Sequence, residues 1–246
     1  VSETNGQPGG AVGAYSINQE DGSLKHINTE STVGPGPCHL SVDARGQYVL
    51  VANYGGGSVA VLPTKDDGAL LKANDFIQHE GSSVNPDRQQ EPHAHSIMIA
   101  PNNRYAYAPD LGMDKIMIYN LDLEKGKLQP NSQPYQSVDP GQGPRHFDFH
   151  PNNHYAYVIN EIGNTIVSYN YNEELGTLDP TGSVPTLPSN FTGTSHTADI
   201  HVHPNGNFLY GSNRGHDSLV VCAIDQSNGE LEVIGHVATG GKNPRN

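Results

Sequence analysis

Ionisable side chains stand at matching places of a repeated unit in this sequence and could together do chemistry on a small anion. They are His95, Glu161 and the arginines Arg145, Arg214 and Arg245. Arginine presents a planar fork that pairs with two oxygens of a carboxylate or phosphate. A glutamate among arginines stays ionised and can accept a proton from water or from a carbon beside a carbonyl. A histidine can exchange protons near neutral pH or donate to an oxyanion.

The same residues also have a purely structural interpretation, a ring of salt bridges that ties the repeated units together. A metal site is disfavoured. His201 and His203, like His93 and His95, are spaced so that both face one side of a strand, which would suit a metal. However, His203 corresponds to His150 in a repeated turn before Pro-Asn, so a turn role is favoured, and a metal at the His93 pair is disfavoured as well. We therefore predict no metal and no cofactor.

The elements that would position these residues come from a repeat, which is clearest in residues 143–179. There, valine, isoleucine, tyrosine and phenylalanine alternate with small or polar residues between turn formers, as is typical of short strands. Matching turns precede Tyr48, Tyr105, Tyr155 and Phe208, which are spaced by 57, 50 and 53 residues. A period of about 50 residues with several strands per unit indicates a β-propeller of four-stranded blades. No sustained helical periodicity is present, so we predict an all-β fold.

In each blade the innermost strand runs antiparallel to its neighbour. The residue that begins the first strand and the residue that ends the second therefore lie at one mouth of the ring. Aligned by the turns, the residues that begin the innermost strands are Cys38, His95, Arg145, Ala198 and Arg245. Those that end the second strands are Tyr54, Leu111, Glu161 and Arg214. Residues with a purely structural role should be the same in every blade, whereas the residues at these aligned positions differ from blade to blade. We therefore expect them to form a central pocket.

The sequence predicts one propeller domain over residues 1–246 that is incomplete at both ends. Residues 11–18 and 24–28 match the third and outer strands of a blade, so the inner strands of the first blade are expected to be missing. Residues 241–246 match residues 141–146, where an innermost strand begins, so the C-terminal blades are expected to be missing too. The period favours about six or seven blades in the complete ring, and we expect seven. Long inserts at residues 78–90 and 186–197 are typical of functional or mobile loops.

Charge and composition narrow the range of partners. The chain has 26 acidic against 13 basic residues, a formal charge of −13, which argues against binding nucleic acid through the whole surface. No apolar stretch approaches the roughly 18 residues of a membrane helix. We therefore predict a soluble protein without nucleic-acid or membrane partners, in which any anion site is local. Cys38 and Cys222 lie in different repeats, so a disulfide between them is disfavoured. A reducing, cytoplasmic location is therefore the simpler expectation.

Several stretches resemble the seven-bladed β-propeller lactonase family, whose members include bacterial 6-phosphogluconolactonases and fungal 3-carboxy-cis,cis-muconate lactonizing enzymes. The stretches are residues 91–96 (EPHAHS), 143–146 (GPRH), 150–152 (HPN), 155–161 (YAYVINE) and 198–204 (ADIHVHP). The resemblance covers nearly the whole chain from residue 11 onward. It implies a metal-free lactone hydrolase or cycloisomerase whose catalytic residues are His95, Arg145, Glu161 and Arg214. We assign substrate binding to the neighbouring His93, His146 and Arg245.

We therefore predict a hydrolase that opens a small anionic sugar-acid lactone, 6-phosphogluconolactone of the pentose phosphate pathway. The anion would dock on Arg145 and Arg214. Glu161 or His95 would take a proton from the attacking water, and an arginine or protonated His95 would stabilise the oxyanion. A 3-carboxy-cis,cis-muconate cycloisomerase would share these residues, so the sequence does not separate the two activities. A non-catalytic propeller that serves as a binding platform is disfavoured, because its blades would be nearly identical at the mouth.

Overall fold

The structure of the chain is a computed structural model that describes residues 2–3 and 9–246, all of them in strands, turns and loops. The first sheet contains β1 (Ser2–Glu3), β2 (Gly10–Ile17) and β3 (Leu24–Ser31). The second contains β4 (Pro37–Val42), β5 (Tyr48–Asn53), β6 (Ser58–Pro63) and β7 (Asp75–Gln78). The third contains β8 (Met98–Ile99), β9 (Tyr105–Asp110), β10 (Lys115–Asp122) and β11 (Lys127–Ser137).

Two further sheets complete the described part of the chain. The fourth contains β12 (Pro144–Phe149), β13 (Tyr155–Asn160), β14 (Thr165–Asn172) and β15 (Thr177–Pro185). The fifth contains β16 (His196–Val202), β17 (Phe208–Arg214), β18 (Ser218–Ile224) and β19 (Leu231–Ala238). Every pair of neighbouring strands is antiparallel. In the described residues, no helix is long and apolar enough to cross a membrane.

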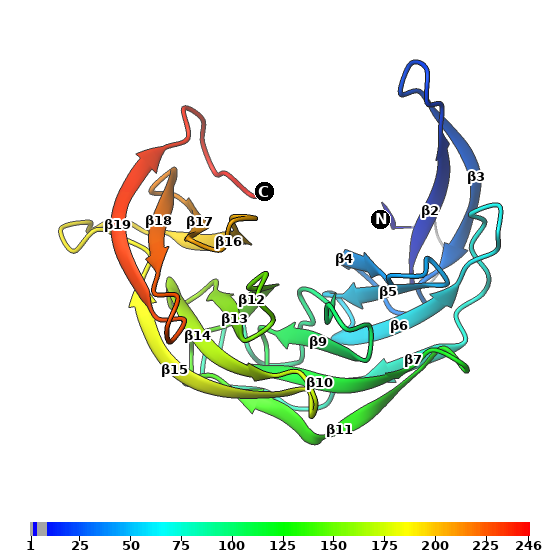
Figure 1. The fold of residues 1–246 in the computed structure, drawn as a ribbon, viewed down its shortest axis with the longest axis horizontal. Coiled ribbons are helices and arrows are strands. Elements are labelled where there is room, and N and C mark those ends of the chain that lie inside the picture. The colour runs from blue at the N-terminus through cyan, green and yellow to red at the C-terminus, as the bar shows by residue number, and fades with distance from the viewer. Residues whose placement is uncertain (1, 4–8) are drawn as a thin grey trace.

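The five sheets are arranged as blades around a common axis and form an open arc (Figure 1). The first strands of the blades, among them β4, β12 and β16, lie nearest the axis, whereas β7, β11, β15 and β19 lie on the outer rim (Figure 1). The prediction of an all-β propeller with four-stranded blades is therefore confirmed. One strand was not predicted: the two-residue β1 pairs with β2, so a third strand stands beside the two expected in the first sheet.

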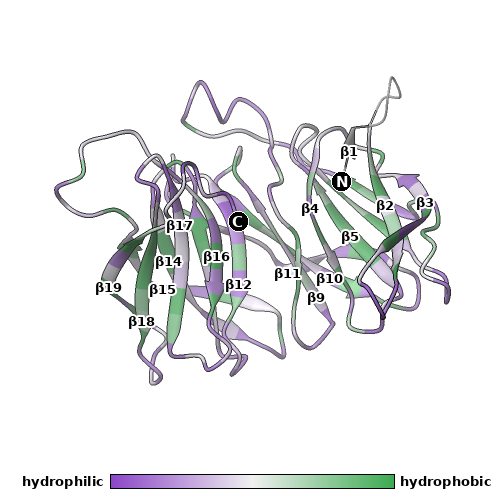
Figure 2. Cartoon of the chain, turned by 90° about the horizontal axis from the view of Figure 1, so that it is seen from above, coloured by the Kyte–Doolittle hydropathy of each residue, from purple (hydrophilic) through white to green (hydrophobic). Residues whose placement is uncertain are grey.

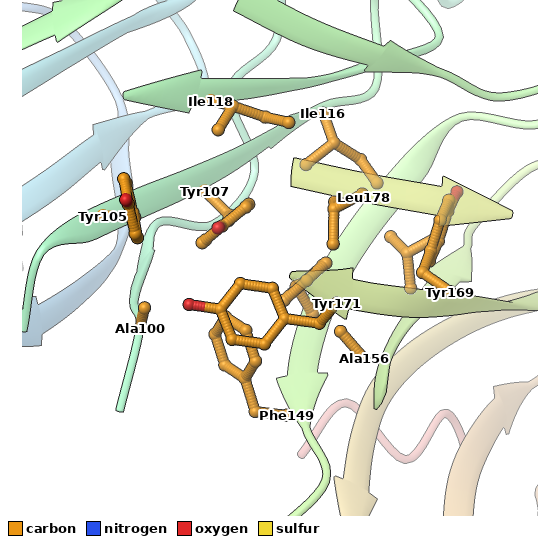
Figure 3. Packing of buried hydrophobic residues seen from close by; sticks show 12 residues of the cluster. Ala100, Tyr105, Tyr107, Ile116, Ile118, Phe149, Ala156, Tyr169, Tyr171 and Leu178 are labelled. Atoms are coloured by element: carbon orange, nitrogen blue, oxygen red, sulfur yellow. The ribbon is translucent and has the colours of Figure 1, made fainter. Parts of the chain in front are cut away.

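The hydrophobic core lies between neighbouring blades, because both faces of each middle strand are covered. All six residues of β13 are buried, and so are all six of β9. One cluster joins Tyr107 and Ile118 of the third blade to Phe149 and Tyr171 of the fourth (Figure 3). Figure 2 shows hydrophobic residues along the middle strands and hydrophilic residues in many of the connecting loops.

The repeated aromatic residues dock each blade on the next one. The ring of Tyr105 lies against Gly176, in the turn before the outermost strand of the fourth blade, and the ring of Tyr155 lies against Gly229, in the turn before the outermost strand of the fifth. Tyr107 adds a hydrogen bond of 2.8 Å from its hydroxyl to the carbonyl of Gly176. Gly176 has a φ of +70°, a left-handed conformation that glycine adopts without steric cost. The period of the sequence thus reflects a contact between blades.

A register shift interrupts the innermost strand of the second, fourth and fifth blades near its start. The register changes by one residue between Pro37 and His39 in β4, and between Pro144 and His146 in β12. The unpaired residue of β12 is therefore Arg145. Bulges re-aim side chains and are frequent beside functional sites. In the third blade, predicted to have an inner strand over residues 95–100, only Met98–Ile99 pairs as a strand.

Candidate active site

Glu161 lies at the centre of a cluster of arginines at one mouth of the arc. It directly follows β13, and its side chain is 5% exposed. Arg88 Nη2 donates to Glu161 Oε1 at 2.7 Å, and Arg145 Nε donates to Oε2 at 3.0 Å. Arg214 Nη2 lies 2.8 Å from the same Oε2. Three guanidinium groups from three separate parts of the chain therefore converge on one carboxylate.

Two of these arginines also bind backbone carbonyls of the fifth blade. Arg145 is the bulged residue of β12, is 1% exposed, and donates from Nη1 to the carbonyl of Ala198 at 2.6 Å. Arg214, the last residue of β17, donates from Nη2 to the carbonyl of Thr197 at 2.7 Å. These bonds fix the orientation of both side chains, so the arrangement exists before any ligand binds.

His95 lies next to this cluster and is 4% exposed. Its Nε2 lies 3.8 Å from Glu161 Oε2, and its Nδ1 lies 3.9 Å from Cys38 Sγ. The ring packs edge-on against Tyr54 at a centroid distance of 5.1 Å. Burial, followed by the nearby charge of Arg145, lowers the pKa of His95 well below its usual value. The imidazole is therefore neutral at neutral pH and able to accept a proton.

The arginines decide the charge state of Glu161. Burial alone would raise its pKa, but the hydrogen bond from Arg88 and the charges of Arg214 and Arg145 outweigh burial, so the pKa is lowered. Burial lowers the pKa of Arg145 to about 10, against the opposing effect of Glu161. At neutral pH the cluster therefore holds three positive charges and one negative charge.

A cavity of about 600 Å³ opens beside the cluster. It is lined by Gly36, Pro37, Cys38, Tyr54, Gly55, Arg88, His95, Glu161, His196, Arg214 and Arg245. Three of the four residues predicted to be catalytic, His95, Glu161 and Arg214, are thus on its wall. Arg145 is not, because it lies buried behind Glu161. The expectation that an anion docks directly on Arg145 does not agree with this position.

The three residues assigned to substrate binding lie in different surroundings. Arg245 is exposed and lines the cavity. His93 is stacked on Tyr54 at a centroid distance of 4.5 Å, and its Nδ1 lies 3.0 Å from the carbonyl oxygen of Tyr54. His146 Nδ1 lies 2.7 Å from Asp199 Oδ1. Neither histidine lines the cavity.

Arg88 and His196 are ionisable residues of the cavity wall that were not predicted. Arg88 belongs to the long insert of residues 78–90, which the sequence identified as a loop without indicating which side chain reaches the mouth. Cys38 and Tyr54 were aligned to the mouth but received no role. Both cysteines are free, as expected from their separate repeats. No group of three or more His, Cys, Asp or Glu within the described ranges is arranged to hold a metal ion.

The model of the family described as "Lactonase, 7-bladed beta-propeller" matches residues 1–246. The chain belongs to this family. The 6-phosphogluconolactonase of Bacillus subtilis is 39% identical over 245 residues, which cover 100% of this chain and 68% of the relative. The 6-phosphogluconolactonase of Formosa agariphila is 34% identical and is covered to 70%. The expected membership of the lactonase family is therefore confirmed.

A solved structure agrees with this assignment. The periplasmic gluconolactonase of Pseudomonas aeruginosa superposes with a TM-score of 0.92 at 31% sequence identity, covering 98% of this chain and 68% of that one. The chain thus spans about two thirds of the length of the relatives it matches.

Proposed function

We propose that this protein hydrolyses the ring ester of a phosphorylated sugar lactone of the 6-phosphogluconolactone type. The observation that carries the proposal is the cluster at the cavity, where Arg88, Arg145 and Arg214 surround the single carboxylate of Glu161. Two positive charges are in excess there, and Arg245 adds another on the wall, although the chain as a whole carries −13. A local positive field inside an acidic protein attracts a small anion to this one place.

The dimensions of the cavity suit a substrate of this class. Pockets for small molecules occupy roughly 300–1,000 Å³, and this cavity measures about 600 Å³. The names of the matched relatives, 6-phosphogluconolactonase and gluconolactonase, support a sugar-acid lactone. A phosphorylated lactone crosses a membrane poorly because of its charge, so the proposal places the protein in the cytoplasm, with the substrate as part of the pentose phosphate pathway.

His95 is the proposed general base. Its neutral imidazole takes a proton from a water molecule while the oxygen of that water forms a bond to the lactone carbonyl carbon. An arginine of the wall donates to the carbonyl oxygen as negative charge develops on it. When the tetrahedral intermediate collapses, the bond between the carbonyl carbon and the ring oxygen breaks. The proton then passes from His95 to the ring oxygen, which becomes a hydroxyl.

Glu161 has a different proposed role, that of holding the arginines and stabilising the protonated His95. Both of its carboxylate oxygens are occupied by guanidinium groups, and its lowered pKa makes it a weak base. It lies 3.8 Å from His95 Nε2, which is close enough to favour the imidazolium electrostatically. Arg145 orients Glu161 from behind without touching substrate.

The proposal is tested by the rate of hydrolysis of 6-phosphogluconolactone and of gluconolactone by the purified full-length protein. The spontaneous rate without protein is subtracted, since lactones open in water. We expect the phosphorylated lactone to have the higher kcat/KM. Equal rates with and without protein for both compounds would refute the proposed hydrolysis. Catalysed cyclisation of a carboxymuconate instead would assign the site to a cycloisomerase.

A further inference from the structure

Arg88 is the arginine of the cluster that comes from a loop and not from a blade. Residues 79–93 connect β7 to the third blade. They bring Arg88 into contact with Glu161, which lies 73 residues later in the sequence. The Arg88 side chain is 34% exposed, compared with 18% for Arg214 and 2% for Arg145. Among the three arginines that contact Glu161, Arg88 is therefore the most exposed, and it lines the cavity.

The loop is held at both of its ends by Asp110. His79 Nδ1 lies 2.6 Å from Asp110 Oδ2, and the backbone N–H of His93 donates to Asp110 Oδ1 at 2.7 Å. His79 and Asp110 have no exposed side-chain surface, and His79 Nε2 lies 2.8 Å from the hydroxyl of Tyr119. A buried, hydrogen-bonded network of this kind fixes the two ends of the loop relative to each other.

The middle of the loop is held as well. Gln89 is completely buried and donates from Nε2 to the carbonyl of Leu111 at 2.8 Å. The backbone N–H of Arg88 donates to Asn85 Oδ1 at 3.1 Å. Ser83 Oγ donates to Asp114 at 2.5 Å. With its backbone fixed at this many points, the loop presents Arg88 in one place, so a ligand meets a preformed group.

The hydrogen bonds of Arg88 leave part of its guanidinium group available. Within the described part of the chain, both side-chain bonds use Nη2, one to Glu161 at 2.7 Å and one to the hydroxyl of Tyr54 at 3.3 Å. The N–H groups of Nη1 and Nε remain for a ligand. Arg145, in contrast, uses both Nε and Nη1 for protein partners. A planar fork with unused donors is the arrangement that pairs with two oxygens of a phosphate or carboxylate.

We propose that Arg88 binds the anionic substituent of the substrate and thereby determines the preference for a phosphorylated over an unphosphorylated sugar lactone. This inference rests on the proposed function. In it, His95 and Arg214 act at the reacting carbonyl, whereas Arg88 contacts the part of the substrate that does not react. Removal of Arg88 should therefore weaken binding of the charged substrate more than that of an uncharged lactone and so lower the preference for the phosphorylated compound.

The test compares wild type with Arg88→Gln and Arg88→Lys in the full-length protein. For Arg88→Gln we expect kcat/KM for 6-phosphogluconolactone to fall by about 10- to 100-fold, mainly through KM, since a hydrogen bond to a charged group is lost. For gluconolactone we expect a smaller fall, because that substrate lacks the charged partner and any effect transmitted through Glu161 is common to both lactones, so the ratio of the two kcat/KM values should fall by about 10-fold or more. Arg88→Lys should give an intermediate loss, as lysine keeps the charge but not the fork. Arg104→Gln, at an exposed turn residue, is the matched control.

A second measurement makes the outcome independent of turnover. Isothermal titration of 6-phosphogluconate and gluconate, the stable products, should show that Arg88→Gln weakens binding of the phosphorylated acid alone. Equal losses for both lactones, or unchanged kinetics, would overturn the role of Arg88. If wild type binds 6-phosphogluconate through Arg88 but hydrolyses no lactone, the proposed reaction fails and the anion site stands. If wild type does not bind 6-phosphogluconate, the inference fails as well.

Discussion

Arg145 Nε donates a hydrogen bond of 3.0 Å to Glu161 Oε2, and the two side chains are only 2% and 5% exposed. The bond connects the bulge of β12 to the end of β13, the two strands nearest the axis in the fourth blade. A buried ion pair contributes little net stability in itself, but removing one partner leaves an uncompensated charge in the interior. The stability of the cluster should therefore depend strongly on Glu161, whose loss would leave the buried charge of Arg145 uncompensated.

Replacement of this carboxylate should affect stability as well as activity. Glu161→Gln leaves three arginines without their counter-charge, so we expect a loss of about 3–5 kcal/mol in the free energy of unfolding. Urea denaturation of the purified protein measures this loss. The exposed Glu174→Gln is the control and should unfold at the wild-type midpoint. An unchanged midpoint for Glu161→Gln would show that the cluster is not held by its carboxylate.

Replacement of the proposed base should affect the rate of reaction more than the fold. His95→Asn removes the group that accepts the proton of water, and we expect kcat to fall by about 10²- to 10⁴-fold. The thermal unfolding temperature provides the check that the variant is folded. His154→Asn, at an exposed turn, should keep the wild-type kcat. A His95→Asn variant with wild-type kcat would remove His95 from the mechanism.

The pH dependence of the reaction follows from the lowered pKa of His95. Burial, with Arg145 nearby, disfavours the imidazolium, so His95 stays neutral as pH falls through 6.5, the usual imidazole value. We expect kcat/KM to be constant from neutral pH down through 6.5 and to fall only at lower pH. Gluconolactone is the substrate to use, because a phosphate group titrates with a pKa of about 6. A midpoint at or above 6.5 would contradict a buried, neutral base.

The contact between blades can be tested at Gly176. Its φ of +70° disfavours any side chain, and an added Cβ would lie 2.5 Å from the ring of Tyr105. Left-handed backbone alone costs a residue other than glycine about 1–2 kcal/mol, so Gly176→Ala should destabilise the protein by at least that amount. Differential scanning calorimetry measures the effect. Gly182→Ala, where no heavy atom lies within 4 Å, should have little effect, and equal melting temperatures for the two variants would refute the contact.

The sequence was sufficient to predict the architecture because propeller strands depend on local patterns. The aromatic residues after each turn and the alternation of residues within strands are visible in a single chain. Strand β13 begins and ends at the predicted residues, Tyr155 and Asn160. The predicted length of the inner strand of the third blade was wrong, since only Met98–Ile99 pairs with β9 and Ala94 forms an isolated bridge to Asp110. Pairing between distant segments leaves no periodic signal.

The candidate site was predictable only in part, for a similar reason. Alignment of the blades brought Glu161 and Arg214 to one mouth, and the structure places both on the cavity wall. The alignment did not reveal that Arg145 is buried and does not line the cavity, because its position is set by its bonds to Glu161 and to the carbonyl of Ala198. Nor did it find Arg88, since a loop without repeats has no equivalent position in the other blades. The roles assigned to the site residues remain predictions.

The measurement that tests the central claim most directly is hydrolysis of 6-phosphogluconolactone by purified full-length wild type and its His95→Asn variant, followed as acid release at constant pH. The account predicts a rate for wild type well above the spontaneous rate, saturation at low substrate concentration, and loss of most of this rate in the variant. A wild-type rate equal to the spontaneous rate, or a His95→Asn variant as fast as wild type, would contradict it.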